Sequence, residues 1–210
     1  MSALDRPVII GRSSSHFTRI ARLFAAELRV DHSFQVLRDL LSTDPADYGG
    51  NPALRIPVLK TSRGAWFGAL NVSRELWRQS HPRPRVVWPE DLDVPLLANV
   101  QELTLQAMAT EVTLVMEKMA GGGEGTTHAL KLRKSLLNMM AWLEEHSSAA
   151  LAALPPERDL SYLEVTLYCL VTHLEFRDVL PIAPYAALNR FRQQFEQRPS
   201  ARDTAFHFDT

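Results

Sequence analysis

A proline-rich segment divides the sequence into two parts with different hydrophobic patterns. It reads HPRPRVVWPE and spans residues 81–90. Three prolines so close together restrict the backbone and favour an extended conformation. Before this segment, apolar residues follow both strand-like and helix-like spacing, and after it they follow only helix-like spacing. The sequence therefore predicts two domains, residues 1–80 and 91–210, joined by a linker over residues 81–90.

The first part has the pattern of a small α/β domain. Short apolar runs bounded by turn residues predict strands, and apolar residues three and four apart predict helices. A strand, a helix and a second strand of this length favour parallel pairing of the two strands. The expected order is strand, helix, strand, loop, strand, strand and helix, at residues 7–11, 17–28, 33–37, 42–52, 56–60, 65–68 and 70–80.

The second part is predicted to contain only helices. A long helix carries apolar residues from Leu97 to Met119, the sequence GGGEGTT ends it, and another helix follows at about residues 128–146. The sequence SYLE, from Ser161 to Glu164, has the spacing of a capping box at the start of a further helix. A last helix is expected over YAALNRFRQQF, near the C-terminal end.

Three consecutive serines, Ser13, Ser14 and Ser15, precede the first predicted helix. A serine there has two possible uses. It can cap the helix by accepting a hydrogen bond from a backbone amide. It can also hold a thiolate over the helix end, where unpaired amides and the helix dipole favour negative charge. The local sequence is compatible with either use.

Three stretches together resemble the cytosolic glutathione transferases. They are SHFTRIARLFAAEL, which begins at Ser15, NPALRIPVL, which begins at Asn51, and LSYLEVTLYCLVTHLEF, which begins at Leu160. Their order and spacing extend the resemblance over the whole chain. It implies a thioredoxin-like α/β N-terminal domain, an all-α C-terminal domain, and glutathione as co-substrate. It also implies that Ser15 is the catalytic hydroxyl of a Ser-type enzyme.

The magnitudes allow such a role for one serine. Lowering the pKa of a thiol from about 8.5 by about two units requires about 2.7 kcal/mol. A hydrogen bond to a charged acceptor contributes about 1.5–3 kcal/mol, and the helix end adds about 0.3–1 kcal/mol. Ser15 is the favoured residue, while a shift of a few residues in the helix boundary would favour Ser13 or Ser14 instead.

The resemblance also assigns a peptide-binding role to the NPALRIPVL stretch. It implies a cis Ile56–Pro57 bond and pairing of the Ile56 backbone with the cysteinyl part of glutathione. Arg55 is then placed to face the glycine carboxylate. The alternatives are a trans proline that opens a strand and a solvated surface arginine.

Two departures from the family pattern affect the expected ligand site. Gly68 and Ala69 occupy the cofactor-binding positions where the family usually has Glu-Ser or Gln-Ser for the γ-glutamyl end of glutathione. Leu54 stands where the NPxG pattern has glycine, and His16 stands where proline is common. The first departure predicts weak binding of glutathione.

Two functions follow from these features. The first is a transferase that binds glutathione and activates its thiol for attack on a small apolar electrophile. The second is a non-catalytic binding or protein-interaction module of the same fold. The resemblance also implies a homodimer.

The composition limits the other possibilities. The net charge of −1 argues against binding to nucleic acid or to an anionic membrane. The apolar runs are too short for a membrane span. The spacing of the histidines predicts no metal site. The single cysteine, Cys169, and the absence of a signal-peptide pattern favour a cytoplasmic location.

Overall fold

The computed structural model describes residues 6–121 and 125–209. Residue contacts group the chain into two units. The first contains the residues up to Pro84 together with those from Gln197 onward, and the second contains Arg85–Glu196. The predicted boundaries, with a linker at residues 81–90, differ from this grouping mainly at the C-terminal end. That end groups with the first unit.

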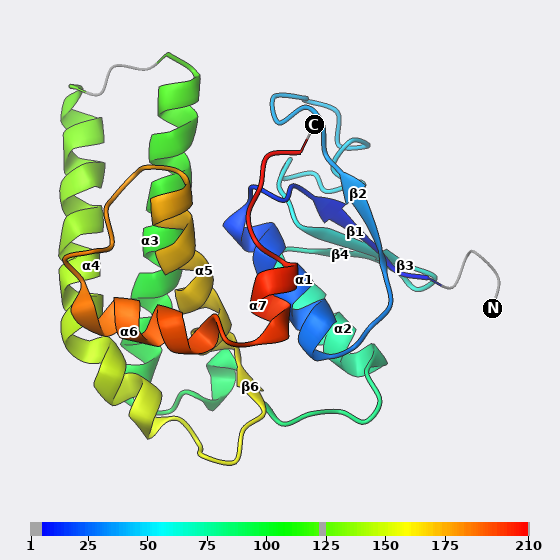
Figure 1. The fold of residues 1–210 in the computed structure, drawn as a ribbon. Helices are drawn as coiled ribbons and strands as arrows, with labels where there is room; N and C mark the ends of the chain where they lie inside the picture. The colour runs from blue at the N-terminus through cyan, green and yellow to red at the C-terminus, as the bar shows by residue number, and fades with distance from the viewer. Residues whose placement is uncertain (1–5, 122–124, 210) are drawn as a thin grey trace. The chain divides into compact units, whose positions relative to one another are not determined.

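The first unit contains a four-stranded mixed sheet, as the sequence predicts (Figure 1). The strand order is β2-β1-β3-β4, with β1 and β2 parallel and the other pairs antiparallel. The strands are β1 (Val8–Gly11), β2 (Ser33–Val36), β3 (Val58–Thr61) and β4 (Gly64–Phe67). The predicted order of strands and helices in this part is confirmed.

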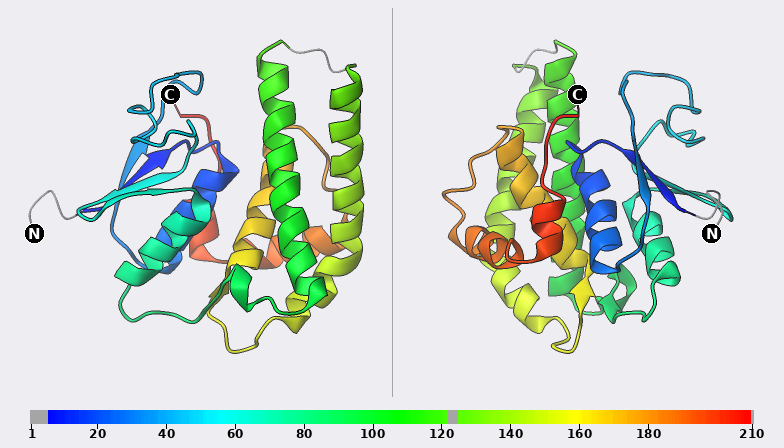
Figure 2. Two further views of the ribbon diagram at one scale, coloured as in Figure 1. Left: turned by 180° about the vertical axis from the view of Figure 1, so that it is seen from behind. Right: turned by 45° about the vertical axis from the view of Figure 1, so that its right-hand side comes forward.

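Two helices pack together and against the sheet (Figure 2). They are α1 (His16–Glu27) and α2 (Ala69–Gln79). The apolar side chains that α1 presents at helical spacing are fully buried, among them Ile20, Leu23 and Phe24. Burial of this stripe stabilises the helix more than intrinsic propensity does.

Gly11 allows β1 and α1 to approach closely. A Cβ atom at this position would lie 2.4 Å from Cγ2 and 2.5 Å from Oγ1 of the buried Thr18. We therefore expect Gly11→Ala to lower the free energy of unfolding by about 1–3 kcal/mol, as overpacking does elsewhere. Chemical denaturation measures this. Gly125→Ala is the control, because nothing lies within 4 Å of the added methyl group. Equal effects of the two changes would contradict the close approach.

The C-terminal end of α1 adopts a left-handed turn without glycine. Arg29, the residue after the C-cap, has a φ of 52°, and the Val30 amide donates to the Ala25 carbonyl at 3.0 Å. This is the hydrogen-bond pattern of a Schellman motif, which usually has glycine at that position.

Arg29→Gly is accordingly expected to stabilise the protein by about 0.5–1 kcal/mol, since a Cβ costs about 1–2 kcal/mol in this conformation and the flexibility of glycine offsets part of the gain. The side chain of Arg29 is exposed, so its loss removes little packing. Thermal denaturation of Arg29→Gly and Arg29→Ala separates the relief of backbone strain from the loss of the arginine side chain. A gain of the same size in the alanine variant would show that backbone strain is not responsible.

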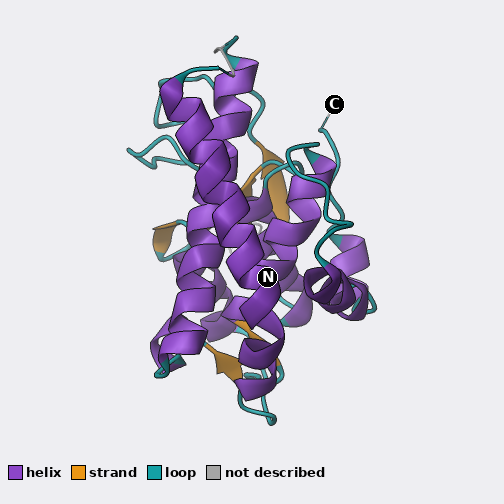
Figure 3. Cartoon of the chain, turned by 90° about the vertical axis from the view of Figure 1, so that its left-hand side faces the viewer, coloured by secondary structure: helices purple, strands orange, loops and turns teal. Residues whose placement is uncertain are grey.

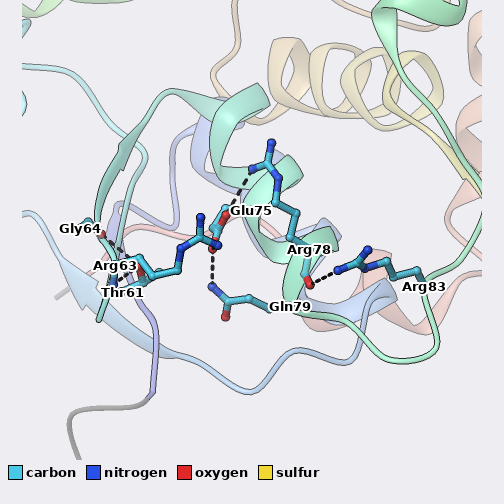
Figure 4. Close-up of polar contacts among 7 residues, drawn as sticks. All are labelled: Thr61, Arg63, Gly64, Glu75, Arg78, Gln79 and Arg83. Carbon is cyan, nitrogen blue, oxygen red and sulfur yellow. Dashed lines mark hydrogen bonds and ion pairs between the residues drawn. The ribbon is translucent and has the colours of Figure 1, made fainter.

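A buried carboxylate anchors α2 to the β3–β4 hairpin. Glu75 is fully buried, and its oxygens lie 3.5 Å from Arg63 Nη1 and 3.2 Å from Arg78 Nη1 (Figure 4). The Gln79 amide donates to the same carboxylate at 3.1 Å. Both guanidinium groups also lie over the ring of Trp66. These contacts hold α2 in place, and α2 begins at Ala69.

The C-terminal segment joins the first unit through α1. Arg19 Nη2 donates to the carbonyl of Ala201, within α7 (Pro199–Asp203), at 2.9 Å. Glu27 accepts from Arg198 at 3.0 Å and also from the hydroxyl of Ser200. Sequence periodicity could not reveal this grouping, because these partners are more than 170 residues apart.

Among its described residues, the second unit contains helices and two very short strands (Figure 3). Its helices are α3 (Pro95–Met119), α4 (Thr127–Ala153), α5 (Tyr162–Phe176) and α6 (Ala186–Phe195), preceded by a 3-10 turn, η1 (Pro89–Asp91). The prediction of helices alone after the linker is wrong at β6 (Leu160–Ser161), which pairs in parallel with β5 (Val86–Val87). Asp159 supports this pairing, since its carboxylate accepts from the Arg85 amide at 2.7 Å.

Helix α5 forms the core of the second unit. Its cap is the predicted one, because Ser161 Oγ accepts from the Glu164 amide at 3.0 Å. The Glu164 carboxylate accepts from the Ser161 hydroxyl at 2.7 Å and pairs with Arg158. Cys169 is fully buried in this helix. Among the residues that the structure describes, each helix is too short or too polar to cross a bilayer.

Candidate functional site

Strand register brings the three predicted site segments to one end of the sheet. Ile10 of β1 pairs with Val58 of β3, and Val58 pairs in turn with Phe67 of β4. The serines follow β1, Pro57 precedes β3 and Gly68 follows β4. The Gly68 amide donates to the Pro57 carbonyl at 3.1 Å. Residues far apart in the sequence are thus neighbours at this end of the sheet.

Ser15 is the N-cap of α1. Its backbone is extended, and its hydroxyl oxygen accepts from the Thr18 amide at 3.3 Å. Ser13 and Ser14 are buried, whereas Ser15 is partly exposed. The structure therefore confirms the capping use of Ser15.

Capping leaves the second use of Ser15 open. A serine hydroxyl has two acceptor lone pairs and one O–H donor. The contact with Thr18 uses a lone pair, so the proton remains available to an anion beside the helix end. The two uses described for this serine are chemically compatible.

Asn51 shapes the loop that precedes β3. Its side-chain amide donates to the Arg55 carbonyl at 2.7 Å, and its side-chain oxygen accepts from the Ala53 amide at 3.0 Å. Leu54 has a φ of 52°, a conformation in which glycine is unstrained, which accounts for the glycine of the family pattern at this position. Leucine occupies it here despite the unfavourable contact of its Cβ.

The end of this loop presents backbone groups beside β3. The Ile56–Pro57 bond is cis, as the resemblance implies. Within residues 6–121 and 125–209, no hydrogen bond uses the amide or carbonyl of Ile56. The side chain of Arg55 is exposed. The Ile56 amide and carbonyl are therefore available as a hydrogen-bond donor and acceptor for an extended peptide.

Gly68 and Ala69 form the start of α2 without a polar side chain. Gly68 is the N-cap, with φ 83° and ψ 150°, and it makes no side-chain cap. A Cβ atom there would meet no heavy atom within 4 Å, yet the positive φ disfavours every residue except glycine. Ala69 is buried as the first residue of the helix. These two residues therefore offer only backbone groups at the start of α2.

Two arginines of α1 add positive charge next to the serines. Burial lowers the pKa of the Arg22 guanidinium, the charge of Arg19 lowers it further, and the Asp209 carboxylate opposes both effects. Arg12 lies between Gly11 and the serines and donates to the Arg38 carbonyl. These arginines were not among the residues predicted for the site. The sequence signal that could have identified them is the pair of arginines three residues apart in the helix.

A further group at this site comes from the C-terminal segment. The Asp209 carboxylate accepts from the backbone amide of Ser13 at 2.8 Å, across 196 residues of sequence. Periodicity and spacing carry no information about such a contact, and no sequence signal could have identified Asp209.

Comparison with known proteins identifies the fold. A glutathione S-transferase from Methylobacillus flagellatus, solved with glutathione bound, is 21% identical, covers 96% of this chain and 100% of its own, and has a TM-score of 0.74. A glutathione transferase family member from Pseudomonas fluorescens with bound glutathione is 19% identical, covers 96% and 99%, and has a TM-score of 0.77. A Tau class enzyme from mango is 16% identical, covers 98% and 94%, and has a TM-score of 0.68.

Sequence comparison adds no further relative. No family profile matches this chain, and no curated protein matches it. The structural matches extend over nearly the whole chain at low identity, so they establish the fold. The chain has the glutathione transferase fold, with a thioredoxin-like N-terminal part and a helical C-terminal part.

Proposed function

We propose that this chain is a glutathione transferase-like protein that binds glutathione at the end of the sheet formed by β1, β3 and β4. The observation that carries the proposal is the convergence of the Ser15 cap, the Ile56 backbone and the start of α2 at that end. The solved neighbours of the same fold that contain glutathione support it.

Each segment has a distinct role in the proposed complex. The Ser15 hydroxyl donates to the thiolate of glutathione, and the positive end of α1 stabilises the same charge. The Ile56 amide and carbonyl pair with the cysteinyl residue, next to the cis bond to Pro57. Arg55 faces the glycine carboxylate. The thiolate then attacks a carbon atom of a small apolar electrophile and forms a thioether, and the leaving group, a halide in the case of an aryl halide, departs with the electron pair of the broken bond.

Binding is expected to be weak because of Gly68 and Ala69. A lost charge-assisted hydrogen bond costs about 1.5–3 kcal/mol, which corresponds to about a 10-fold to 100-fold loss of affinity. The backbone amides at the start of α2 still attract an anionic group. We therefore propose a dissociation constant for glutathione of about 0.1–10 mM.

The same two residues support a second candidate function. Without acidic and hydroxyl groups at this position, the fold can serve as a non-catalytic binding or protein-interaction module. A homodimer and a cytoplasmic location fit either candidate and belong to the proposal.

Calorimetric titration with glutathione distinguishes the two functions. The first predicts saturable binding in the stated range, followed by turnover with an aryl halide electrophile. The second predicts no binding heat at about 10 mM, a concentration chosen from the affinity arithmetic.

Ala69→Ser is the informative gain-of-function variant. Gly68→Glu is less suitable because the φ of 83° would strain any side chain. A regained hydroxyl at Ala69 is expected to tighten binding by about threefold to tenfold, from one neutral hydrogen bond. If Ala69→Ser folds and binds no better, the ligand does not reach the start of α2.

A further inference from the structure

The Asp209 carboxylate forms a hydrogen bond with the backbone of the serine segment. It accepts from the Ser13 amide at 2.8 Å, just before the N-terminus of α1. Ser13 is two residues before the N-cap Ser15, at the end of α1 where the helix dipole favours negative charge. In the structure, the C-terminal segment of the same chain supplies an anionic group, the Asp209 carboxylate.

Contacts along α1 hold this C-terminal segment in place. Arg19 donates to the Ala201 carbonyl at 2.9 Å, and its guanidinium carbon lies 4.3 Å from the centre of the Phe206 ring. Glu27, at the other end of the helix, holds Arg198 and Ser200. The segment therefore follows α1 from its C-terminal end to the serines, and Asp209 is its contact with Ser13.

The Arg22 guanidinium also interacts electrostatically with the Asp209 carboxylate. Arg19 and Arg22 are one turn apart on α1. Burial and the charge of Arg19 lower the pKa of the Arg22 guanidinium, and the Asp209 carboxylate raises it. The contact at Ser13 is thus part of a local charge arrangement. Removal of Asp209 would leave this arrangement without its carboxylate and open to an external anion.

We propose that residues 205–209 act as a built-in competitor of the candidate site, in which Asp209 occupies the Ser13 amide until an anionic group of a ligand replaces it. The competition with glutathione rests on the function proposed above. The occupation of an anion site by the Asp209 carboxylate does not depend on that proposed function.

The first experiment needs no glutathione. The chain truncated after Thr204 is titrated with a synthetic peptide of residues 205–209, and the amide signal of Ser13 is followed by nuclear magnetic resonance. We expect truncation to shift this signal and the peptide to restore it saturably. A peptide with alanine in place of Asp209 should not restore it. An identical Ser13 signal in the full and truncated chains would overturn the proposal.

The second experiment measures competition in the full-length chain. Asp209→Ala is expected to tighten glutathione binding by about 10-fold to 100-fold, the range for one charge-assisted hydrogen bond. Because Asp209→Ala is made in the full-length chain, it tests the proposal even if the truncated chain does not fold. Asp203→Ala is the matched control, since it removes an exposed carboxylate from the same segment. It should leave both the affinity and the Ser13 signal unchanged.

The outcomes separate the two proposals. If no variant binds glutathione but the peptide restores the Ser13 signal, the proposed ligand is wrong and the anion site stands. If glutathione binds equally to the wild type and to Asp209→Ala, the competition is refuted while the binding function stands.

Discussion

Glu111→Ala is expected to lower the free energy of unfolding by about 1–3 kcal/mol, the range for removing one partner of a buried hydrogen bond. Glu111 of α3 is fully buried, and its Oε1 lies 2.7 Å from Nδ1 of the buried His173 of α5. Alanine removes the carboxylate and leaves the imidazole nitrogen without this partner inside the helical unit. Chemical denaturation followed by circular dichroism measures the loss.

Two variants show whether the pair is the cause. Glu102→Ala removes an exposed carboxylate from the same helix, and its effect should stay within about 0.5 kcal/mol. The double variant Glu111→Met with His173→Leu replaces both partners by apolar groups and should recover much of the stability. A Glu111→Ala variant as stable as Glu102→Ala would show that the pair contributes little.

Ser15→Ala is expected to raise the pKa of the thiol of bound glutathione by about one to two units, because one hydrogen bond to the thiolate is lost. From a bound thiol pKa of about 6.5, such a rise lowers the thiolate fraction at about pH 7 by about threefold to 25-fold. The same change removes the cap of α1 and should lower the free energy of unfolding by about 1 kcal/mol. Thiolate absorbance of the complex against pH measures the pKa.

Ser15→Thr and the other serines provide the controls. Threonine keeps a hydroxyl that can both cap and donate, so the thiol pKa should stay near the wild-type value. Ser13→Ala and Ser14→Ala should leave the thiol pKa nearly unchanged. A larger change in either variant than in Ser15→Ala would assign the active hydroxyl to another serine.

The local features of the fold were predictable because each has a local cause. The stripe of Ile20, Leu23 and Phe24 predicts the first helix, and burial of those side chains confirms it. The Ser161 cap was also predictable, since the interacting groups are three residues apart. The short β6 strand was not, because two residues carry no periodicity and their partners lie near Val86.

The site was only partly predictable for the same reason. The resemblance placed Ser15, Pro57 and Gly68, and strand register shows that these positions are neighbours at one end of the sheet. The conformation of Gly68 depends on backbone angles that composition does not reveal. The contact between Asp209 and Ser13 depends on the path of the C-terminal segment along α1, which is decided by tertiary interactions of Arg19 and Glu27.

Amide chemical shifts measured during a glutathione titration test the proposed binding site most directly. We expect saturable changes that centre on Ser13, Ser15, Ile56 and Ala69, in the segments that meet at the end of the sheet. The glutathione concentration that gives half of the full change should be about 0.1–10 mM. Saturable changes that centre elsewhere, or no change at about 10 mM glutathione, would contradict the account.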